Sequence, residues 1–338
     1  MKEWFELNEK DRKSIIDQVS AKTGMIPAAI EKDWWVMIAL RTVFQMKCSK
    51  DLVFKGGTSL SKAWQIIERF SEDIDLGLDR SFFGYTGELA RKNVTALRKA
   101  SCSYITEDFL KELNEQLEVG HIRDFYLEVI EFERSDTDPI AIALNYKSLT
   151  DHIDYIQPRI LIEISSRSLR DPNENKLIQS LIGEQYPDLF FADKKINIPT
   201  VLPSRTFLEK IFLLHEEFQK PLTIKIRSDR MTRHLYDISK LMGTHHEEEA
   251  LSNEELYRNI VKHREMLTKL LWVNYLNHKP GTIDFIPPPR VIQEWKKDYE
   301  KMRESMFYGH TDSFEDLISN LKDLRYRINS LTFEIDSH

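Results

Sequence analysis

Two stretches of the sequence combine residue types that suit phosphoryl transfer. In Lys55–Lys62 (KGGTSLSK), two glycines follow the apolar run Leu52–Phe54 and precede hydroxyl side chains. Glycines at the end of a buried strand allow a ligand to approach the backbone closely. Free N–H groups at the start of a following helix favour a phosphate. We therefore expect a phosphate cradle made of Gly56, Gly57, Thr58 and Ser59, with Lys62 one turn further on.

The second stretch, RFSEDID, runs from Arg69 to Asp75 and ends in two aspartates two positions apart. Polar and apolar residues alternate from Asp73 to Leu78, which predicts a strand with the side chains of Asp73 and Asp75 on one face. Neighbouring carboxylates repel each other unless a cation lies between them. Mg²⁺ suits such a pair, because it takes few protein carboxylates together with phosphate oxygens. Glu163 is the candidate third ligand, since a lone acid in the apolar run RILIEIS is costly to bury unless paired or bound to metal.

Each motif has a simpler interpretation when it is taken alone. A Gly-Gly pair after a strand is usually a turn, and a DxD pattern is common on exposed strands. The glycine spacing matches neither the GxxxxGK[ST] nor the GxGxxG pattern. The order of strand, glycine turn, helix and DxD strand is more specific than any one part. It indicates a metal-dependent phosphoryl-transfer site.

The elements around these motifs predict an α+β fold. Helices are expected in the first fifty residues and at 58–70 and 87–117, and strands at 125–132, 140–146 and 159–164. Beyond Pro199 the apolar periodicity is helical, at 207–218, 233–242, 253–272, 289–306 and 313–331. We therefore expect a mixed-sheet domain with flanking helices (1–200) and a helical bundle (201–338) that completes the active-site cleft.

Composition excludes several classes of protein. The 338 residues are 41% hydrophobic and 30% charged, as in a globular protein large enough to fold without a staple. The two cysteines, Cys48 and Cys102, are too few for a disulfide framework and suit a reducing compartment, so we expect a cytoplasmic protein. The N-terminus has no signal-peptide core, and no apolar run is long enough to span a membrane.

The net charge of −7 disfavours a broad nucleic-acid-binding surface, because phosphate binding relies on basic residues. One local stretch runs against this charge. The fifteen residues 219–233 contain five basic residues and one acid, Asp229. The basic residues are Lys220, Lys225, Arg227, Arg230 and Arg233. The stretch is either a solvated connector or a confined contact for an RNA backbone.

The motif GGTSLSK-x6-RFSEDIDL resembles the signature of the AbiEii/AbiGii toxin family, the nucleotidyltransferase halves of AbiE-type toxin–antitoxin systems. The mycobacterial MenT toxins are relatives within the DNA polymerase β-like nucleotidyltransferase superfamily. Further stretches are similar to the family over most of the chain. They are Ile30–Trp35, Arg205–Lys210, Arg233–Ile238 and Asp298–Gly309 followed by Ser313-Phe314.

The resemblance implies a polymerase β-like fold and roles for individual residues. Gly56 to Ser59 would hold a nucleoside triphosphate, and Asp73 and Asp75 would hold Mg²⁺. Lys210 matches the family's second-domain lysine and Asp237 its C-terminal aspartate, both expected in catalysis. Lys62 and Arg69 join the nucleotide-binding candidates, although both could be surface helix charges. The family pattern has Arg-Asp where this chain has Arg233-His234.

These inferences lead to the expectation of a toxin that transfers NMP from an NTP to the 3′ end of tRNA and acts in phage defence. We expect a monomer whose cognate antitoxin is encoded nearby. Two alternatives stay open: transfer to a protein or a small molecule, and a non-catalytic interaction module. The intact DxD pattern disfavours the last of these.

Overall fold

The computed structural model describes residues 2–71, 73–87, 89–151, 156–167 and 170–334. The chain divides into two compact units. Unit 1 contains residues 1–64 and 70–201, and unit 2 contains residues 65–69 and 202–338. The chain leaves unit 1 at Gln65 and returns at Phe70, so the first residue of the second motif, Arg69, belongs to unit 2. No signal in the sequence marks this excursion.

Unit 1 is built on a mixed sheet, to which the described residues contribute seven strands. The strands are β1 (Leu52–Lys55), β2 (Ile74–Leu78), β3 (Phe125–Val129), β4 (Ile140–Tyr146), β5 (Arg159–Ser165), β6 (Asn173–Ile178) and β7 (Ile196–Val201). Their order is β3-β4-β5-β2-β1-β7-β6. The pairs β2–β5 and β1–β7 are parallel, and the others are antiparallel. The strands that carry the two motifs therefore lie at the centre of the sheet.

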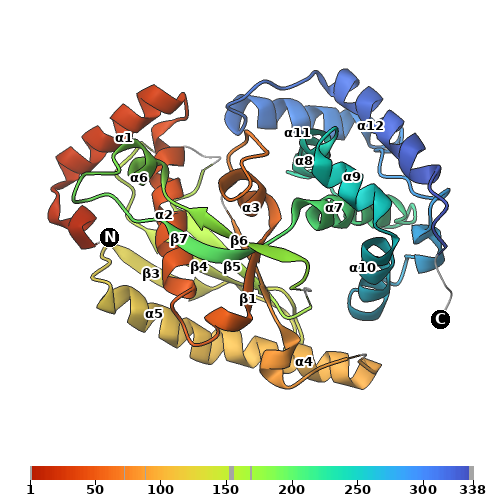
Figure 1. The fold of residues 1–338 in the computed structure, drawn as a ribbon, viewed down its shortest axis with the longest axis horizontal. Coiled ribbons are helices and arrows are strands. Elements are labelled where there is room, and N and C mark those ends of the chain that lie inside the picture. The colour runs from red at the N-terminus through yellow and green to blue at the C-terminus, as the bar shows by residue number, and fades with distance from the viewer. Residues whose placement is uncertain (1, 72, 88, 152–155, 168–169, 335–338) are drawn as a thin grey trace. The chain divides into compact units, whose positions relative to one another are not determined.

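Helices of unit 1 pack on this sheet (Figure 1). They are α1 (Glu9–Thr23), α2 (Pro27–Val43), α3 (Gly56–Lys62), α4 (Arg91–Tyr104), the π-helix η4 (Ile105–Phe109), α5 (Leu110–Val119) and α6 (Leu181–Gln185), with short 3₁₀ turns η1 (Lys2–Glu6), η2 (Ser49–Asp51) and η3 (Arg80–Phe83). Asn8 caps α1 through its side chain, and Pro27 starts α2. Helix α2 is buried on almost all of its faces and contacts both β5 and α5. It is therefore part of the hydrophobic core of unit 1.

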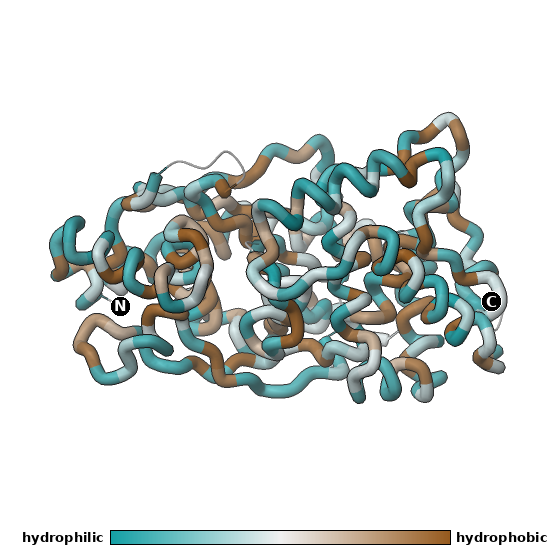
Figure 2. Tube along the Cα trace, turned by 90° about the horizontal axis from the view of Figure 1, so that it is seen from above, coloured by the Kyte–Doolittle hydropathy of each residue, from teal (hydrophilic) through white to brown (hydrophobic). Residues whose placement is uncertain are grey.

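Unit 2 consists of helices gathered around α7 (Pro203–Phe218) and α8 (Thr232–Leu241). The others are α9 (His245–Ser252), α10 (Glu254–Leu267), the 3₁₀ turn η5 (Tyr275–His278), α11 (Ile292–Ser305) and α12 (Phe314–Asn329). Figure 2 shows hydrophobic and hydrophilic residues alternating along these helices, as amphipathic segments require. The α+β class with a mixed sheet and helices after it is confirmed. Among the described residues no helix is long and apolar enough to cross a membrane.

Some elements differ from the sequence prediction. The helix expected over 58–70 ends at Lys62, Gln65 adopts a positive φ of 55°, and Arg69 pairs as an isolated bridge with Phe307. Residues 65–69 follow a helical apolar pattern but are held in unit 2 by tertiary contacts, which override local propensity. Strands β6 and β7 and helix α9 were not expected. The polar sequence of β6, NENKLI, is typical of an edge strand and has no alternating apolar face.

Candidate active site

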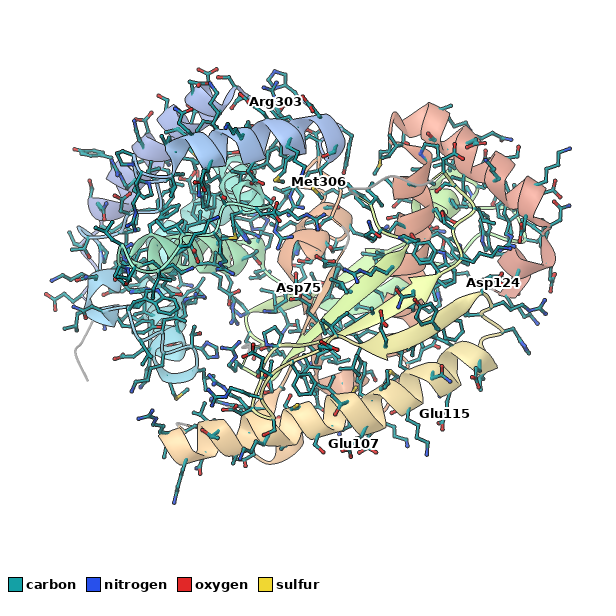
Figure 3. The ribbon with its side chains drawn as sticks, turned by 180° about the vertical axis from the view of Figure 1, so that it is seen from behind. Asp75, Glu107, Glu115, Asp124, Arg303 and Met306 are labelled. Carbon is teal, nitrogen blue, oxygen red and sulfur yellow. The ribbon has the colours of Figure 1, made fainter. Side chains whose placement is uncertain are left out.

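The first motif forms a tight turn between β1 and α3. Gly56 follows the last residue of β1 and has a φ of +80°, which favours glycine. A Cβ built at this position would overlap the carboxylate of Asp75. Gly56 is therefore required both by its backbone conformation and by the space that Asp75 occupies. Figure 3 shows Asp75 on β2 beside α3.

One acid of the second motif, Asp75, lies in a row with Lys55 and Glu163 across the centre of the sheet. The strand expected to carry both aspartates begins only at Ile74, so Asp73 precedes β2 and does not belong to this row. Lys55 of β1 is paired with Asp75 of β2, and Asp75 is paired with Glu163 of β5. Paired residues on neighbouring strands are about 5 Å apart and point to the same face. The flanking residues Ile74 and Leu76 are fully buried on the opposite face. The register thus brings Glu163 next to Asp75, with a lysine on the other side.

The hydroxyl groups of Thr58 and Ser59 form hydrogen bonds within the two motifs. Thr58 is 2% exposed, and its hydroxyl donates to the backbone carbonyl of Asp73 and lies 3.0 Å from Ser71 Oγ. Ser59 is fully buried, and its hydroxyl donates to the carbonyl of Gly56 at 2.9 Å. Thr58 therefore fastens the two motifs to each other. The backbone amides of the turn, more than these hydroxyls, are the groups suited to a phosphate.

The carboxylates suit a metal that is held only partly by protein. Within the residues that the structure describes, no three His, Cys, Asp or Glu side chains lie close enough together to form a complete metal site. Mg²⁺ typically takes one or two carboxylates and completes its shell with water and substrate phosphates. Asp75, with Glu163 beside it on β5, is compatible with such a site, and whether Asp73 joins it stays a prediction.

Lys62, a sequence candidate for nucleotide binding, is engaged inside unit 1. Its ammonium lies 2.5 Å from Asp33 Oδ1 and donates to the carbonyl of Gln179 at 2.9 Å. The side chains of Lys62 and Asp33 are only 8% and 11% exposed. In this arrangement the charge of Lys62 is already compensated.

Three further candidates meet within unit 2, around one buried carboxylate. Arg69 Nε lies 2.7 Å from Asp237 Oδ1 and its Nη2 2.8 Å from Oδ2, while Lys210 Nζ is 2.9 Å from the same Oδ2. Asp237 is fully buried, Arg69 is 2% exposed and Lys210 is 7% exposed. Burial opposes ionisation of Asp237, but the charges of Arg69 and Lys210 prevail and lower its pKa well below the usual range. Asp237 is therefore ionised, and its carboxylate forms ion pairs with both Arg69 and Lys210.

The cations of this cluster outnumber its acid. Burial, together with the charges of Arg69 and Arg233, lowers the pKa of Lys210, although Asp237 opposes this shift. The side chain of His234 has its Nδ1 3.5 Å from Lys210 Nζ. Burial and the nearby charges of Lys210 and Arg233 lower the pKa of His234 well below its ordinary value. A neutral histidine at this position adds no further positive charge.

The basic stretch 219–233 is less positive than its sequence indicates. Lys220 is buried and its ammonium lies 2.5 Å from Glu217 Oε1, while the guanidinium of Arg227 donates twice to Glu217 Oε2 at 2.8 and 3.0 Å. Glu217 precedes the stretch and compensates part of its charge. Lys225 and Arg227 are exposed, whereas Arg230 and Arg233 are partly buried. The exposed cations of this stretch are thus Lys225 and Arg227, of which Arg227 is already paired with Glu217.

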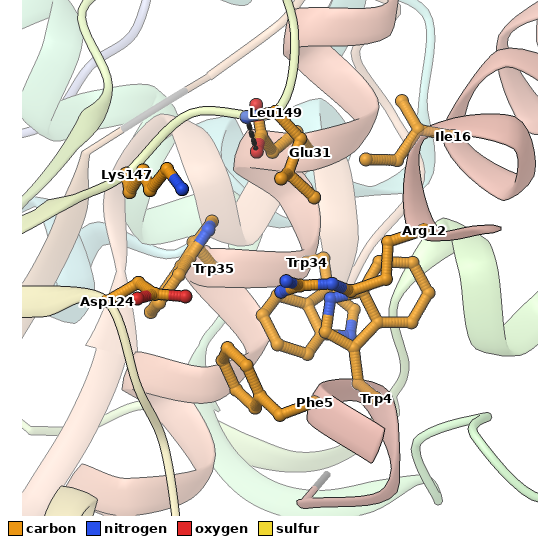
Figure 4. Close-up of a pocket in the computed structure, with 10 residues that line it drawn as sticks. All are labelled: Trp4, Phe5, Arg12, Ile16, Glu31, Trp34, Trp35, Asp124, Lys147 and Leu149. Carbon is orange, nitrogen blue, oxygen red and sulfur yellow. Dashed lines mark hydrogen bonds between the residues drawn. The ribbon is translucent and has the colours of Figure 1, made fainter. Parts of the chain in front are cut away.

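A small cavity lies elsewhere in unit 1, between α1, α2 and the segment after β4 (Figure 4). Its volume of about 10 Å³ is room for roughly one water molecule. The side chains around it are mainly aromatic, with several charged groups. They are Trp4, Phe5, Arg12, Ile16, Glu31, Trp34, Trp35, Asp124, Lys147 and Leu149. The cavity is too small to admit a nucleotide.

Comparison with known families shows which family the chain belongs to. The sequence model of the nucleotidyl transferase AbiEii toxins of type IV toxin–antitoxin systems matches residues 39–320. The chain belongs to the AbiEii nucleotidyltransferase toxin family. No curated protein matches the chain. The AbiEii match includes both motifs, Glu163, Lys210 and Asp237, whereas Asp33 lies upstream of it.

Two residues beside the AbiEii motifs were missed as site candidates. Lys55 flanks Asp75 on β1, and Asp33 holds Lys62 from α2. A signal for Asp33 was present, because Glu31-Lys32-Asp33 interrupts an otherwise apolar helix. Charged residues that are buried in such a helix need partners. The catalytic roles expected of Lys210 and Asp237, and the nucleotide contacts expected of Lys62 and Arg69, stay predictions.

Proposed function

We propose that this AbiEii family member is a Mg²⁺-dependent enzyme that transfers NMP from an NTP to the 3′ end of a tRNA and releases pyrophosphate. The observation that carries the proposal is the row of Lys55, Asp75 and Glu163 on adjacent strands, with Gly56 packed against the Asp75 carboxylate. A turn without side-chain atoms thus adjoins the acids, as binding of a metal-bridged triphosphate requires.

In this proposal each residue has a defined task. Asp73 and Asp75 would hold Mg²⁺, and Glu163 would complete the charge from its place beside Asp75 on β5. The metal supplies compensation for the negative charge of the phosphates. The amides of the Gly56-Gly57 turn orient the triphosphate, while Thr58 keeps the Asp73 backbone in place through its hydroxyl. In-line attack by the acceptor hydroxyl on the α-phosphate then displaces pyrophosphate.

The acceptor and the biological setting are also part of the proposal. Lys225 and Arg227, exposed on unit 2, are the candidates for contact with the RNA backbone. Loss of functional tRNA would halt translation, which accounts for toxicity and for a role in phage defence. An antitoxin is the expected counterpart of a toxin from this family.

The experiment is a transfer assay with each labelled NTP in turn, offered total RNA and total protein with Mg²⁺. We expect label on RNA of tRNA size, loss of label with EDTA and recovery when Mg²⁺ is added back. Asp73→Ala and Asp75→Asn should each reduce transfer by at least about 1,000-fold, a loss typical of essential charge-stabilising groups.

The matched control is Asp188→Ala, which removes an exposed aspartate of unit 1. It should transfer at the wild-type rate. Label on protein alone would reject the tRNA acceptor and keep the chemistry. Full activity of a folded Asp73→Ala variant would reject the proposed site.

A further inference from the structure

Three consecutive charged residues of α2 are buried in unit 1. Glu31 is 3% exposed, Lys32 2% and Asp33 9%. Burying such charges is costly unless each one is compensated. Glu31 accepts from the backbone N–H of Leu149 at 2.7 Å, and Lys32 donates to the carbonyl of Gln157 at 3.0 Å. Glu31 and Lys32 thus bind two different segments to α2. Asp33 binds Lys62 of the first motif.

Asp33 uses both of its carboxylate oxygens. Oδ1 lies 2.5 Å from Lys62 Nζ, and Oδ2 accepts from the backbone N–H of Leu181 at 2.7 Å. The Lys62 ammonium also donates to the carbonyl of Gln179. One carboxylate therefore joins α2, the end of α3 and the start of α6. Because the two side chains are almost fully enclosed, solvent screens this ion pair little.

The position of Lys62 within α3 gives the ion pair a consequence at the site. Lys62 is the last residue of a seven-residue helix whose first residue is Gly56. A helix this short moves as a rigid piece, so fixing its last residue also fixes the turn at its start. Gly56 must clear the Asp75 carboxylate, and a small shift of α3 would change that spacing.

We propose that Asp33 is a positioning residue for the nucleotide: it holds Lys62, and through Lys62 it sets the Gly56-Gly57 turn against Asp75. This inference rests on the proposed function for its effect on NTP. In this arrangement Lys62 acts as an internal anchor for α3, and the turn amides act on the phosphates.

The test compares Asp33→Asn, Lys62→Met and the double variant Asp33→Asn/Lys62→Met in the full chain. Each single variant leaves one buried charge without its counter-charge and is expected to unfold more easily. The double variant removes both charges, so it should fold even if a single one does not. Glu9→Gln is the matched control, because it breaks the exposed Glu9–Lys147 pair of the same unit.

Two measurements are made on each folded variant. The first is hydrogen exchange of the amides of residues 56–62, which does not depend on activity. The second is kcat/KM for the NTP together with KM for the acceptor RNA. We expect the double variant to exchange at least tenfold faster in 56–62 and to lose at least 30-fold in kcat/KM for the NTP. KM for the RNA should change less than twofold, and Glu9→Gln should match the wild type.

The possible outcomes distinguish failure of the positioning role of Asp33 from failure of the proposed function. Unchanged exchange and unchanged kcat/KM in the double variant would overturn the positioning role. Wild-type kcat/KM in folded Asp33→Asn, with a loss in Lys62→Met, would assign Lys62 a direct phosphate contact and overturn it as well. Faster exchange in 56–62 with no transfer by the wild type would support the anchor while rejecting the proposed function.

Discussion

The α-carbon of Gly56 faces the carboxylate of Asp75 so closely that a Cβ added at position 56 would overlap this carboxylate. We expect Gly56→Ala to lose at least about 100-fold in transfer activity, because the added methyl group displaces a metal-binding carboxylate. The substitution also strains a backbone with a φ of +80°, at a cost of about 1–2 kcal/mol. A radiolabelled transfer assay and urea unfolding measure the two effects.

Gly84→Ala is the control for this substitution. Gly84 has nearly the same φ, +79°, but a Cβ built there meets no atom within 4 Å. Gly84→Ala should therefore show the backbone strain without the loss of activity. Equal activity losses in both variants would mean that the Asp75 contact has no role.

The buried cluster around Asp237 predicts a large effect on stability. In Asp237→Asn, Arg69 and Lys210 stay buried and lose the carboxylate that compensates their charges. Breaking a buried ion pair in this way costs about 3–5 kcal/mol, which urea unfolding would measure. Glu300→Gln, in the exposed Lys296–Glu300 pair of the same unit, should leave the urea midpoint unchanged. An equally small shift for Asp237→Asn would contradict the structural account.

His215 predicts a pH dependence of stability. Burial, with the neighbouring His278, lowers its pKa to about 4 from an ordinary 6.5. Its Nδ1 accepts from the backbone N–H of Asp284, which requires the unprotonated ring. Between pH 6.5 and 4 the unfolded chain binds a proton that the folded chain does not, so stability falls as the pH falls.

The contribution of His215 over this range is about 3 kcal/mol at most. His215→Gln should flatten the dependence of the unfolding free energy on pH between 6.5 and 4, measured by urea titrations at several pH values. His310→Gln, which changes an exposed histidine, should leave that dependence as it is. A slope unaltered in His215→Gln would show that other groups take up the proton.

The two exposed cations of the basic stretch predict the salt dependence of RNA binding. Lys225→Ala and Arg227→Ala should each reduce the slope of log affinity against log salt by about 0.7–1, the value for one phosphate contact. Lys220→Met should instead lower stability, because Lys220 is buried against Glu217. Lys322→Ala, on the exposed side of α12, is the control for general loss of charge. Unchanged slopes in the first two variants would exclude this surface from RNA binding.

The motifs that carry the candidate site were predictable because they are local. The glycine turn, the DxD alternation and the strand RILIEIS each depend on a few consecutive residues. Glu163 was chosen as a lone acid in an apolar strand, and the parallel pairing of β2 with β5 brings it beside Asp75. The pairing itself is not encoded locally, so its register could be known only from the structure.

The partners of the charged residues were less predictable. Lys62 and Arg69 follow helical patterns in which a cation is usually solvated, yet both are buried. Their partners, Asp33 and Asp237, are far away in the sequence, and no local pattern connects them. For the same reason Glu217 escaped notice as the acid that offsets the basic stretch. Residues that bind charges across the fold require tertiary structure to identify.

The contacts of residues 65–69 bear on the order in which the chain folds during its synthesis. They connect the two motifs, but their contacts are with Tyr236, Asp237 and Lys240 and with the segment around Tyr308. On the ribosome both motifs emerge before the residues that hold 65–69, on the order of ten seconds earlier. A nascent or prematurely terminated chain therefore carries both motifs while their connection is still unanchored.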